Sequence, residues 1–465
     1  METPNIPGKG QITEEDTICA VSTPPGRGGV GIIRISGGKT RTILEALMPE
    51  RKVFPPREMV FGPLRDRDGG VLDEAMAVYF SAPHSYTGED VAELHCHGNP
   101  TLLDWVMERI KEICPESRSA QPGEFTKRAY LNKKMDLLEA EAVMDLISAT
   151  NREALAVSLH QMEGALGQAL HPIIERVRLA TAGMEAAIDF PEEDWEVEAV
   201  DTAITGLREA YGALEDLCNT YHRGRLLMEG IRCAMVGRPN TGKSSLLNAV
   251  AGYERAIVDK EEGTTRDVLE YPFSFRGQTI RLMDTAGRRE NVNGPEAVGL
   301  RLGEWAAQES DVALLILDGS RALTQEDQEA AQLVRNKNVV IALNKTDLPL
   351  LVGEEEAATL VPRAKVVAIS ALAARGLDTL FAAVLEAAGT VESTGVVITN
   401  ARQRDCLLAA RDSVLKALSA HDRGMEYDLV SLDAMEALAS LMELTGETAR
   451  ESVIDTIFAQ FCVGK

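Results

Sequence analysis

The residues best suited to chemistry lie in a glycine-rich segment, Gly237-Arg-Pro-Asn-Thr-Gly242-Lys243-Ser244, which fits the pattern GxxxxGK[ST]. Its glycines let a loop wrap around phosphates, so that backbone N–H groups face the anion. We expect Lys243 to reach the β- and γ-phosphates and the hydroxyl of Ser244 to bind Mg²⁺. The apolar run Ile231–Val236 stands directly before the loop, and this order of strand, loop and helix predicts a nucleoside triphosphate site.

Two shorter motifs indicate the base. Asn344-Lys-Thr-Asp347 ends in a carboxylate that can accept hydrogen bonds from N1 and N2 of guanine. Adenine offers no such pair of donors, so the motif predicts guanine. Ser370 and Ala371 follow a further apolar run and complete the expected base pocket.

Two more motifs stand where Mg²⁺ and the γ-phosphate are expected. Asp284 opens the sequence Asp-Thr-Ala-Gly287 and can hold Mg²⁺ through a water molecule, while Gly287 can sense the γ-phosphate. The pair Thr264-Thr265 lies where a switch threonine would close over Mg²⁺. The residues that these motifs predict at the GTP site are Asn240, Thr241, Gly242, Lys243, Ser244, Ser245, Thr264, Thr265, Asp284, Thr285, Ala286, Gly287, Asn344, Lys345, Asp347, Ser370 and Ala371.

One expected catalytic group is missing. Many small GTPases place a water-orienting Gln directly after the glycine of the Asp-x-x-Gly motif, and this chain has Arg288 there. Hydrolysis therefore needs another device. Arg288 could itself neutralise charge, although a solvated arginine is the simpler interpretation.

Composition limits the function classes. The 465 residues exceed one compact domain, so about two to four are expected. With 48 basic and 72 acidic residues the net charge is −24, which argues against a surface that binds RNA as a whole. The seven scattered cysteines form no CxxC pair and suit a reducing cytoplasm. No apolar run of about 18 residues predicts a membrane span, and the N-terminus does not read as a signal peptide.

Short apolar runs alternate with helical patterns over residues 231–388. Such runs are typical of buried parallel strands in a doubly wound sheet. The strands expected are Ile231–Val236, Ile280–Met283, Val312–Leu317, Val339–Leu343 and Val366–Ile369.

Residues 16–115 instead read as an α+β unit rich in strands. Runs of β-branched or alternating residues, separated by Gly/Pro clusters, predict strands at Thr17–Ser22, Val30–Ser36, Leu72–Phe80 and Val91–His97. An amphipathic helix over Thr101–Cys114 closes this unit.

Helical patterns lie on both sides of the alternating region. From Phe125 to His222 the best stripe runs from Leu155 to Ile188 as one face of a long helix, which Pro172 should kink or break. After a linker at 389–397, helical patterns return over Leu407–Leu418, 430–443 and 446–461. We predict one helical domain interrupted by an inserted nucleotide-binding domain, with two separate helical domains as the alternative.

These motifs together resemble the MnmE (TrmE) family of tRNA-modification GTPases over essentially the whole chain. The most specific of them is the terminal Cys462-Val-Gly-Lys465 on a chain with this type of G domain. The segments that carry the resemblance are Thr23–Gly37, Tyr86–Leu94, Pro122–Leu137, Ala187–Pro191, Gly237–Asp267 and Phe461–Lys465.

The resemblance implies a multidomain α/β architecture. An N-terminal α+β domain of the tetrahydrofolate-binding type, which also dimerises, would cover residues 1–120. A discontinuous helical domain would cover 121–225 and 390–465, and a Ras-like P-loop G domain inserted in it would cover 226–389.

The resemblance also implies catalysis by potassium, with a K⁺ ion in place of an arginine finger. A cation beside the β,γ-bridge offsets the charge that develops during phosphoryl transfer. The K⁺ ligands implied are Asn240, Thr264 and main-chain carbonyls near Asp259 and Glu261, with Asp259 counted at the GTP site. Glu296 would position the attacking water, and Arg266 is included among the catalytic residues.

In the first domain the family binds a folate, either 5-formyl- or 5,10-methylene-tetrahydrofolate. By match, Arg34, Glu93, Lys134 and Lys465 fall at the folate positions. A carboxylate such as Glu93 suits the amide-like edge of a pterin, and Arg or Lys suits the glutamate tail. Cys462 is either a nucleophile in the modification chemistry or a small buried side chain.

A cluster of possible metal ligands, His95-Cys96-His97, carries less weight. On a strand the two histidines share one face and Cys96 points to the other, and no further ligands stand at suitable spacing. We therefore expect no metal there.

The function implied is that of a cytoplasmic, potassium-activated GTPase. With the flavoprotein MnmG it would add a carboxymethylaminomethyl-type group at C5 of the wobble uridine of certain tRNAs. The implied partners are a second copy of the chain, MnmG and tRNA, with no membrane. The alternatives are a ribosome-assembly GTPase and a self-assembling mechanical GTPase. The first usually carries a basic RNA module and the second a membrane-binding element, and neither is visible in the sequence.

Overall fold

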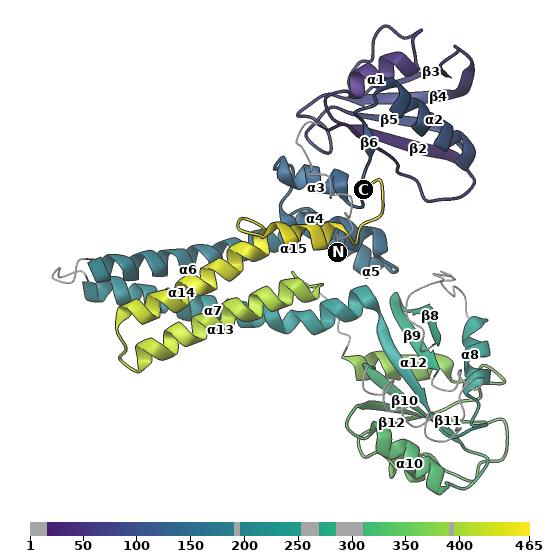
Figure 1. Cartoon of the computed structure of the whole chain (residues 1–465). Helices are drawn as coiled ribbons and strands as arrows, with labels where there is room; N and C mark the ends of the chain where they lie inside the picture. Colours follow the sequence, from purple (N-terminus) through teal and green to yellow (C-terminus); the bar gives the residue numbers. More distant parts are fainter. Residues whose placement is uncertain (1–15, 190–195, 253–268, 285–309, 390–394) are drawn as a thin grey trace, which may run out of the picture. The chain divides into compact units, whose positions relative to one another are not determined.

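The computed structural model describes residues 16–189, 196–252, 269–284, 310–389 and 395–465. The chain divides into two compact units (Figure 1). The first comprises Met1–Met144 with Leu441–Lys465, and the second comprises Asp145–Ser440. The first unit thus joins two segments that are far apart in the sequence, whereas the second is one continuous segment.

The first unit contains a six-stranded sheet in the order β3-β4-β5-β2-β1-β6. Neighbouring strands are antiparallel except for β1 and β6, which are parallel. The four strands predicted here are confirmed, whereas β3, β6 and helix α1 were not predicted. The elements are β1 (Ile18–Val21), β2 (Gly28–Ser36), α1 (Thr40–Leu47), β3 (Met59–Arg65), β4 (Val71–Phe80), β5 (Val91–Gly98), α2 (Pro100–Ile113) and β6 (Arg118–Ser119).

Helices α1 and α2 cover one face of this sheet, because alternate strand residues are apolar on that side. Ile33 and Ile35 of β2 share one core with Leu44 of α1 and Val106 of α2. The residues between them, such as Arg34, therefore point to the opposite face. This alternation places the polar side chains of β2 and β5 together on the face away from the helices.

The C-terminal segment is part of the first unit. Helix α15 (Glu451–Phe458) packs with α3 (Glu124–Leu131) and with the start of α4 (Leu137–Ser148). Lys127 pairs with Asp455 at 2.7 Å. Beyond α15 the chain continues to its last residue, whose carbonyl accepts from the backbone N–H of Phe125 in α3 at 3.2 Å. Both ends of the chain are thereby combined in one unit.

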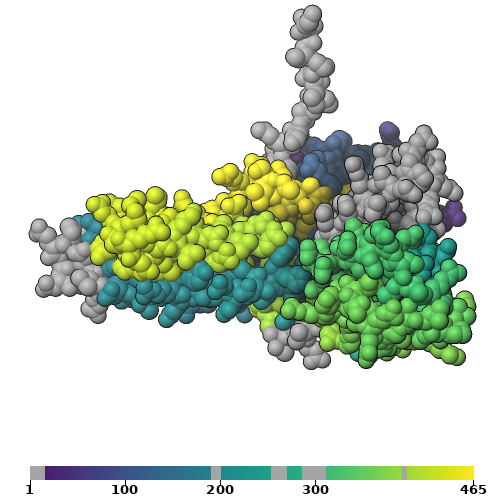
Figure 2. Space-filling model, turned by 90° about the horizontal axis from the view of Figure 1, so that it is seen from below, coloured from purple at the N-terminus to yellow at the C-terminus, as the bar shows by residue number. Residues whose placement is uncertain are grey.

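Long helices form one part of the second unit. They are α5 (Arg152–Met162), α6 (Ala165–Asp189), α7 (Glu196–Glu229), α13 (Ala401–Asp422) and α14 (Tyr427–Thr445). The last five residues of α14 belong to the first unit. Figure 2 shows the yellow-green α13 lying along the teal helices. At the base of α13, the Oγ1 of Thr220 accepts a hydrogen bond from the N–H of Ile398 at 3.0 Å. Gly224 lies so near this segment that a Cβ atom would stand 2.0 Å from the carbonyl oxygen of Ile398. Helical segments that precede and follow the predicted G domain in the sequence thus pack together. The boundaries of the three expected domains stay a prediction.

The single long helix predicted from Leu155 to Ile188 is wrong. The chain breaks at Gly164, whose φ of +83° is left-handed and ends α5. Pro172 lies inside α6 without ending it, because α6 buries Leu170 and Ile173 on either side of the proline. Leu155, on α5, is 41% exposed. The stripe of apolar residues therefore belongs to two helices with different surroundings.

The other part of the second unit is a six-stranded sheet in the order β12-β11-β10-β7-β9-β8. All neighbouring strands are parallel except β8 and β9, and buried apolar clusters lie on both faces. This confirms the predicted doubly wound, Ras-like sheet; only the antiparallel edge strand β8 was not predicted. The elements are β7 (Ile231–Val236), α8 (Lys243–Ala251), β8 (Leu269–Phe275), β9 (Gln278–Asp284), β10 (Val312–Asp318), α10 (Gln325–Val334), β11 (Asn338–Asn344), α11 (Glu354–Ala358), β12 (Lys365–Ala368) and α12 (Leu377–Ala388).

The strand order reverses at β7, with β9 on one side and β10 on the other. In open α/β sheets ligands bind outside the carboxyl ends of the strands at such a point. The loops that follow β7, β10 and β11 are therefore where a nucleotide is expected. Within the described ranges, no helix is both long enough and apolar enough to cross a membrane.

Candidate functional site

The loop between β7 and α8 is shaped by close contacts that only glycine permits. Gly242 has a φ of +102°, and a Cβ atom there would lie 2.2 Å from Nδ2 of Asn344. Asn240 is also left-handed, with a φ of +65°, and its side chain is exposed at the top of the loop. Asparagine tolerates this conformation better than most residues. The sequence GxxxxGK thus forms the compact loop that the motif predicted.

A lysine and an ion pair fix this loop from inside. The Nζ of Lys243 donates to the carbonyl of Gly237 and, at 2.8 Å, to that of Arg238. The Arg238 side chain pairs at 3.1 Å with Asp327, which is 2% exposed and forms the capping box of α10 with Thr324. The loop is therefore fastened to α10, and its lysine is bonded to carbonyls of the loop itself.

The predicted base-binding residues converge on the same edge of the sheet. Asn344 Nδ2 donates to the carbonyl of Thr241 at 2.8 Å, and its Oδ1 accepts from the N–H of Ala371 at 2.9 Å. The hydroxyl of Ser370 donates to Oδ1 of Asp347 at 2.5 Å. Asn344 thus joins the phosphate loop to the base pocket, and the exposed Asp347 carboxylate is held at one oxygen.

The residues proposed for Mg²⁺ lie next to this site where the structure describes them. Ser244 and Ser245 are in the first turn of α8, and Asp284 ends β9 opposite Met235, the penultimate residue of β7. The other predicted residues of this region lie outside the described residues: Asp259, Glu261, Thr264, Thr265, Arg266, Thr285, Ala286, Gly287, Arg288 and Glu296.

One residue of the site, Asp318, was not predicted from the sequence. Lys345 pairs at 2.7 Å with Asp318, the buried last residue of β10. The only signal available was a carboxylate at the end of an otherwise apolar strand, and such a residue has many possible roles.

Two of the four predicted folate residues, Arg34 and Glu93, meet on the face of the first sheet away from α1 and α2. Arg34 pairs with Glu93 at 2.8 Å, and its guanidinium lies 5.6 Å from the ring centres of both Tyr86 and Phe125. Burial raises the pKa of the Tyr86 phenol, so this ring is neutral. Arg34 and Glu93 are paired neighbours on adjacent strands, β2 and β5.

The C-terminal tail lies at this cluster. The carbonyl of Gly464 accepts from Nη1 of Arg34 at 3.3 Å and from the hydroxyl of Ser22 at 3.1 Å. Lys465 follows, with its own carbonyl bonded to the N–H of Phe125. The chain therefore returns its own tail to the first sheet, with no second subunit needed for that contact.

Lys134 and Cys462 complete the predicted residues of this region. Lys134 Nζ donates to the carbonyl of Pro83 at 3.0 Å, in the loop between β4 and β5 that also supplies Tyr86. Cys462 is exposed, so the interpretation of it as a small buried side chain is wrong. It lies beyond the end of α15, outside the core that Phe458 and Phe461 form with α4.

The His95-Cys96-His97 sequence divides between the two faces of β5 as expected. Cys96 is buried in the core, and this burial raises the pKa of its thiol to about 12. His95 lies 3.6 Å from Glu93, and Nδ1 of His97 lies 2.7 Å from a carboxylate oxygen of the buried Asp73. Each histidine thus has a carboxylate neighbour. In the described part of the chain, no three His, Cys, Asp or Glu residues are grouped so as to hold a metal ion.

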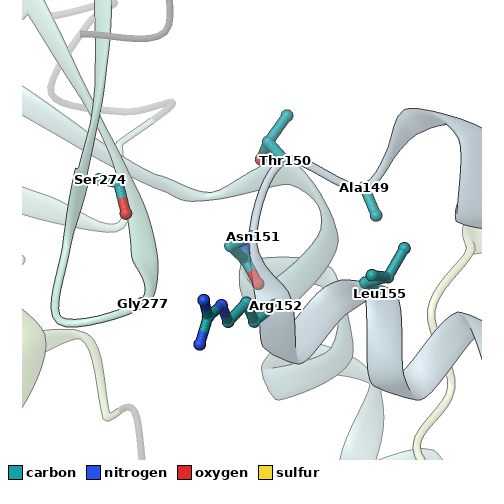
Figure 3. Close-up of a pocket in the computed structure, with 7 residues that line it drawn as sticks. All are labelled: Ala149, Thr150, Asn151, Arg152, Leu155, Ser274 and Gly277. Atoms are coloured by element: carbon teal, nitrogen blue, oxygen red, sulfur yellow. The ribbon is translucent and has the colours of Figure 1, made fainter. Parts of the chain in front are cut away.

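A cavity of about 560 Å³ in the second unit is lined by none of the predicted residues (Figure 3). It lies between the loop before α5 and the β8–β9 hairpin. Hydrogen bonds near it join Thr150 to Thr279 at 2.9 Å and Asn151 to the carbonyl of Leu227 at 3.1 Å. These contacts connect the helical part of the unit to the sheet that carries the phosphate loop.

Comparison with known proteins places these features in a family. Residues 17–134 match the family model of the GTP-binding protein TrmE N-terminus, and residues 137–462 match that of the MnmE helical domain. Among solved structures, the G domain of the T. maritima FeoB iron transporter is 22% identical, with 34% of this chain and 98% of that chain covered and a TM-score of 0.28.

Curated relatives match along nearly the full length. The tRNA modification GTPase MnmE of Natranaerobius thermophilus is 38% identical, covering 97% of this chain and 100% of that protein. The protein of the same name from Geobacillus thermodenitrificans is also 38% identical, covering 98% of this chain and 100% of its own length. The chain therefore belongs to the MnmE family of tRNA modification GTPases.

Proposed function

We propose that this GTPase is activated by potassium and acts with the flavoprotein MnmG. Together they would add a carboxymethylaminomethyl-type group at C5 of the wobble uridine of certain tRNAs, using a one-carbon unit from 5-formyl- or 5,10-methylene-tetrahydrofolate. The observation that carries the GTPase half is the double hydrogen bond of Asn344. It joins the loop that would hold the phosphates to the pocket that would hold guanine.

The described residues fit GTP and Mg²⁺. Lys243 and the backbone N–H groups at the start of α8 would bind the β- and γ-phosphates, and Asp347 would accept from guanine. Mg²⁺ would be held by the Ser244 hydroxyl and, through water, by Asp284, together with Thr265, which lies outside the described residues. Mg²⁺ prefers oxygen ligands and keeps several waters, so two or three protein oxygens beside the phosphates suffice.

Potassium activation is supported by the position of Asn240. Its side chain is exposed, its backbone is in the left-handed conformation, and it precedes Lys243 by three residues in the phosphate loop. An amide oxygen there could bind a monovalent cation beside the phosphates, together with Thr264 and carbonyls near Asp259 and Glu261. Glu296 would orient the attacking water, and Arg266 would assist in catalysis.

Folate binding by the first unit is supported by the Arg34–Glu93 pair and the tail beside it. Glu93 would accept from the pterin edge, and Arg34, Lys134 or Lys465 would neutralise the glutamate tail of the folate. Aromatic faces at Tyr86 and Phe125 already lie against the arginine. Cys462, exposed in the same tail, is proposed as a nucleophile.

A second copy of the chain is the partner proposed for the first unit. Its sheet exposes apolar side chains on the face away from α1 and α2, with Met59 51%, Phe61 56% and Met76 40% exposed. Phe61 and Met76 are cross-strand neighbours. Adjacent exposed apolar residues of this size are typical of protein interfaces. The negative net charge leaves tRNA to a local patch or to MnmG.

We propose that the protein acts in the cytoplasm, where tRNA and GTP are available. The ribosome-assembly alternative has lost its support, because the matched relatives are named tRNA modification GTPases.

The test is nucleoside analysis of bulk tRNA from a strain that lacks the gene. We expect the wobble uridines to lose the C5 group and to regain it when the intact gene is returned. A strain returned with a Lys243→Ala variant should stay unmodified. Normal wobble uridines in the deletion strain would refute the proposed function.

A further inference from the structure

Asp318 is a buried carboxylate at the edge of the guanine site that no predicted role uses. It ends β10, its side chain is 3% exposed, and it lies 2.7 Å from Nζ of Lys345. The hydroxyl and the backbone N–H of Ser320 also donate to it, at 2.6 and 3.1 Å. Burial by itself would raise the pKa of Asp318, but the bonds from Lys345 and Ser320 lower it below its usual value. The group is therefore an ionised carboxylate at neutral pH.

Its partner occupies a demanding backbone position. Lys345 has a φ of +67°, in the left-handed region that residues other than glycine rarely adopt. It stands between Asn344, which fastens the phosphate loop, and the segment that ends in Asp347. The ammonium of Lys345 is directed to Asp318, and this pair spans two neighbouring strand ends, since Asp318 and Asn344 are register partners.

The surrounding backbone holds the two strand ends together. The N–H of Gly319 donates to the carbonyl of Asn344 at 2.9 Å, and the carbonyl of Gly319 accepts from the N–H of Leu351 at 2.8 Å. The loops after β10 and β11 are thus fixed to one another at their main chains. The ion pair adds the only charge-assisted side-chain bond described between Asp318 and the loop that carries Lys345 and Asp347.

We propose that Asp318 is a positioning residue of the guanine site that acts through Lys345. By neutralising and holding the ammonium, it keeps Lys345 in its left-handed conformation and so keeps Asn344 and Asp347 in place. Its effect falls on guanine nucleotide affinity, because the groups expected at the γ-phosphate belong to other loops. The inference rests on the guanine site proposed above.

The experiment uses the full chain and compares Asp318→Asn, Lys345→Met and the double variant. Asparagine keeps the size and the bonds from Ser320 but removes the charge, while methionine keeps an unbranched stem without the ammonium. We expect Asp318→Asn to raise the dissociation rate of a fluorescent GDP and the KM for GTP roughly tenfold, as loss of a charge-assisted bond predicts. The kcat should stay within about twofold of the unmodified value.

The double variant separates positioning from general stability. If Asp318 acts through Lys345, Asp318→Asn should have little further effect once Lys345 is methionine. Glu386→Gln is a matched control, since it removes the carboxylate of an exposed pair, Lys365–Glu386 at 2.6 Å in the same unit, and should change neither rate nor KM.

The outcomes are distinguishable. A GDP dissociation rate within twofold in Asp318→Asn, or additive effects of the two substitutions, would overturn the inference. A lower kcat together with a lower melting temperature and an unchanged KM would also overturn the inference. If Asp318→Asn does not fold, Lys345→Met alone must show the faster GDP release, or the inference fails. Failure of the unmodified chain to bind GDP would instead refute the proposed guanine site.

Discussion

The guanine site and the Arg34–Glu93 site are built on different principles. At the guanine site, backbone geometry does most of the positioning: a glycine with positive φ, N–H groups at the start of α8, and an asparagine that joins two loops. At the other site, the charged side chains of Arg34 and Glu93 form a pair, and Arg34 also donates to the distant backbone carbonyl of Gly464. A site of the first kind tolerates few substitutions at its glycines. A site of the second kind depends on how the chain ends are brought together.

The largest effect we predict is at Gly242. Alanine there would combine a strained φ of +102° with a Cβ atom 2.2 Å from Asn344 Nδ2, which bonds the phosphate loop. We expect GDP affinity, measured by calorimetry, to fall by roughly a thousandfold or more, as loss of several phosphate and loop bonds implies. Gly389→Ala is the control, because Gly389 also has a positive φ but nothing lies near its missing Cβ. Retained affinity in Gly242→Ala would break the contrast drawn between the two sites.

The contrast explains what the sequence could predict. The phosphate loop and the strands of its sheet could be predicted from local patterns. A continuous apolar run before a glycine-rich loop fits few structures other than a buried strand followed by a phosphate loop. The missed strands β3, β6 and β8 are edge strands. Pro63 in β3 and Pro272 in β8 interrupt the usual strand pattern, which an edge strand tolerates.

Features that depend on distant contacts were beyond sequence reasoning. The retention of Pro172 inside a helix depends on burial along α6. The contact of Arg34 with Gly464 joins residues 430 positions apart. Periodicity carries no signal for such a contact, and the family resemblance alone suggested that the tail belonged near the first sheet.

The second prediction concerns the carboxylate that supports the first unit. Glu124 is 2% exposed and bonded to Arg118 at 2.6 Å and to Arg128 at 3.1 Å. Glu124→Gln should therefore lower the free energy of unfolding by about 3 kcal/mol, as breaking a buried pair does. Glu45→Gln, in an exposed pair with Arg41, is the control and should be nearly neutral.

The pH dependence of this effect has a fixed direction. Burial tends to raise the pKa of Glu124, but Arg118 and the N–H of Gln121 lower it below the usual 4.5 overall. The carboxylate therefore contributes its full stability above about pH 4.5 and loses it as the pH falls through the lowered pKa. Chemical denaturation of the unmodified chain and of Glu124→Gln should converge in acid. A difference that stays constant from pH 7 to 3 would contradict the assignment.

A smaller effect is expected for potassium. Asn240→Gly removes the amide without straining the loop, whereas Asn240→Ala also places an alanine at a φ of +65°. Both should lose potassium stimulation, with turnover in KCl falling roughly tenfold, as loss of one charge-stabilising group implies. GDP affinity should stay within about threefold in the glycine variant, because Lys243 remains. Equal turnover of the unmodified chain in NaCl and KCl would refute potassium activation and restore Arg288 as the neutralising group.

The smallest effect that we predict on ligand affinity is also the one that best separates the two sites. Deleting Cys462–Lys465 removes the carbonyl of Gly464 that accepts from Arg34 and Ser22, and it removes Lys465 itself. We expect tetrahydrofolate affinity to fall about fivefold to tenfold, as loss of one or two hydrogen bonds to a charged group implies. Potassium-stimulated GTP hydrolysis should be unchanged, because every described residue proposed for GTP lies in the second unit. A Lys465→Ala variant keeps the Gly464 carbonyl. It therefore shows how much of the lost folate affinity is due to the lysine side chain and how much to the backbone. If the truncated chain binds folate and modifies tRNA normally, the tail is only a structural end, and the proposed placement of the folate site beside it is wrong.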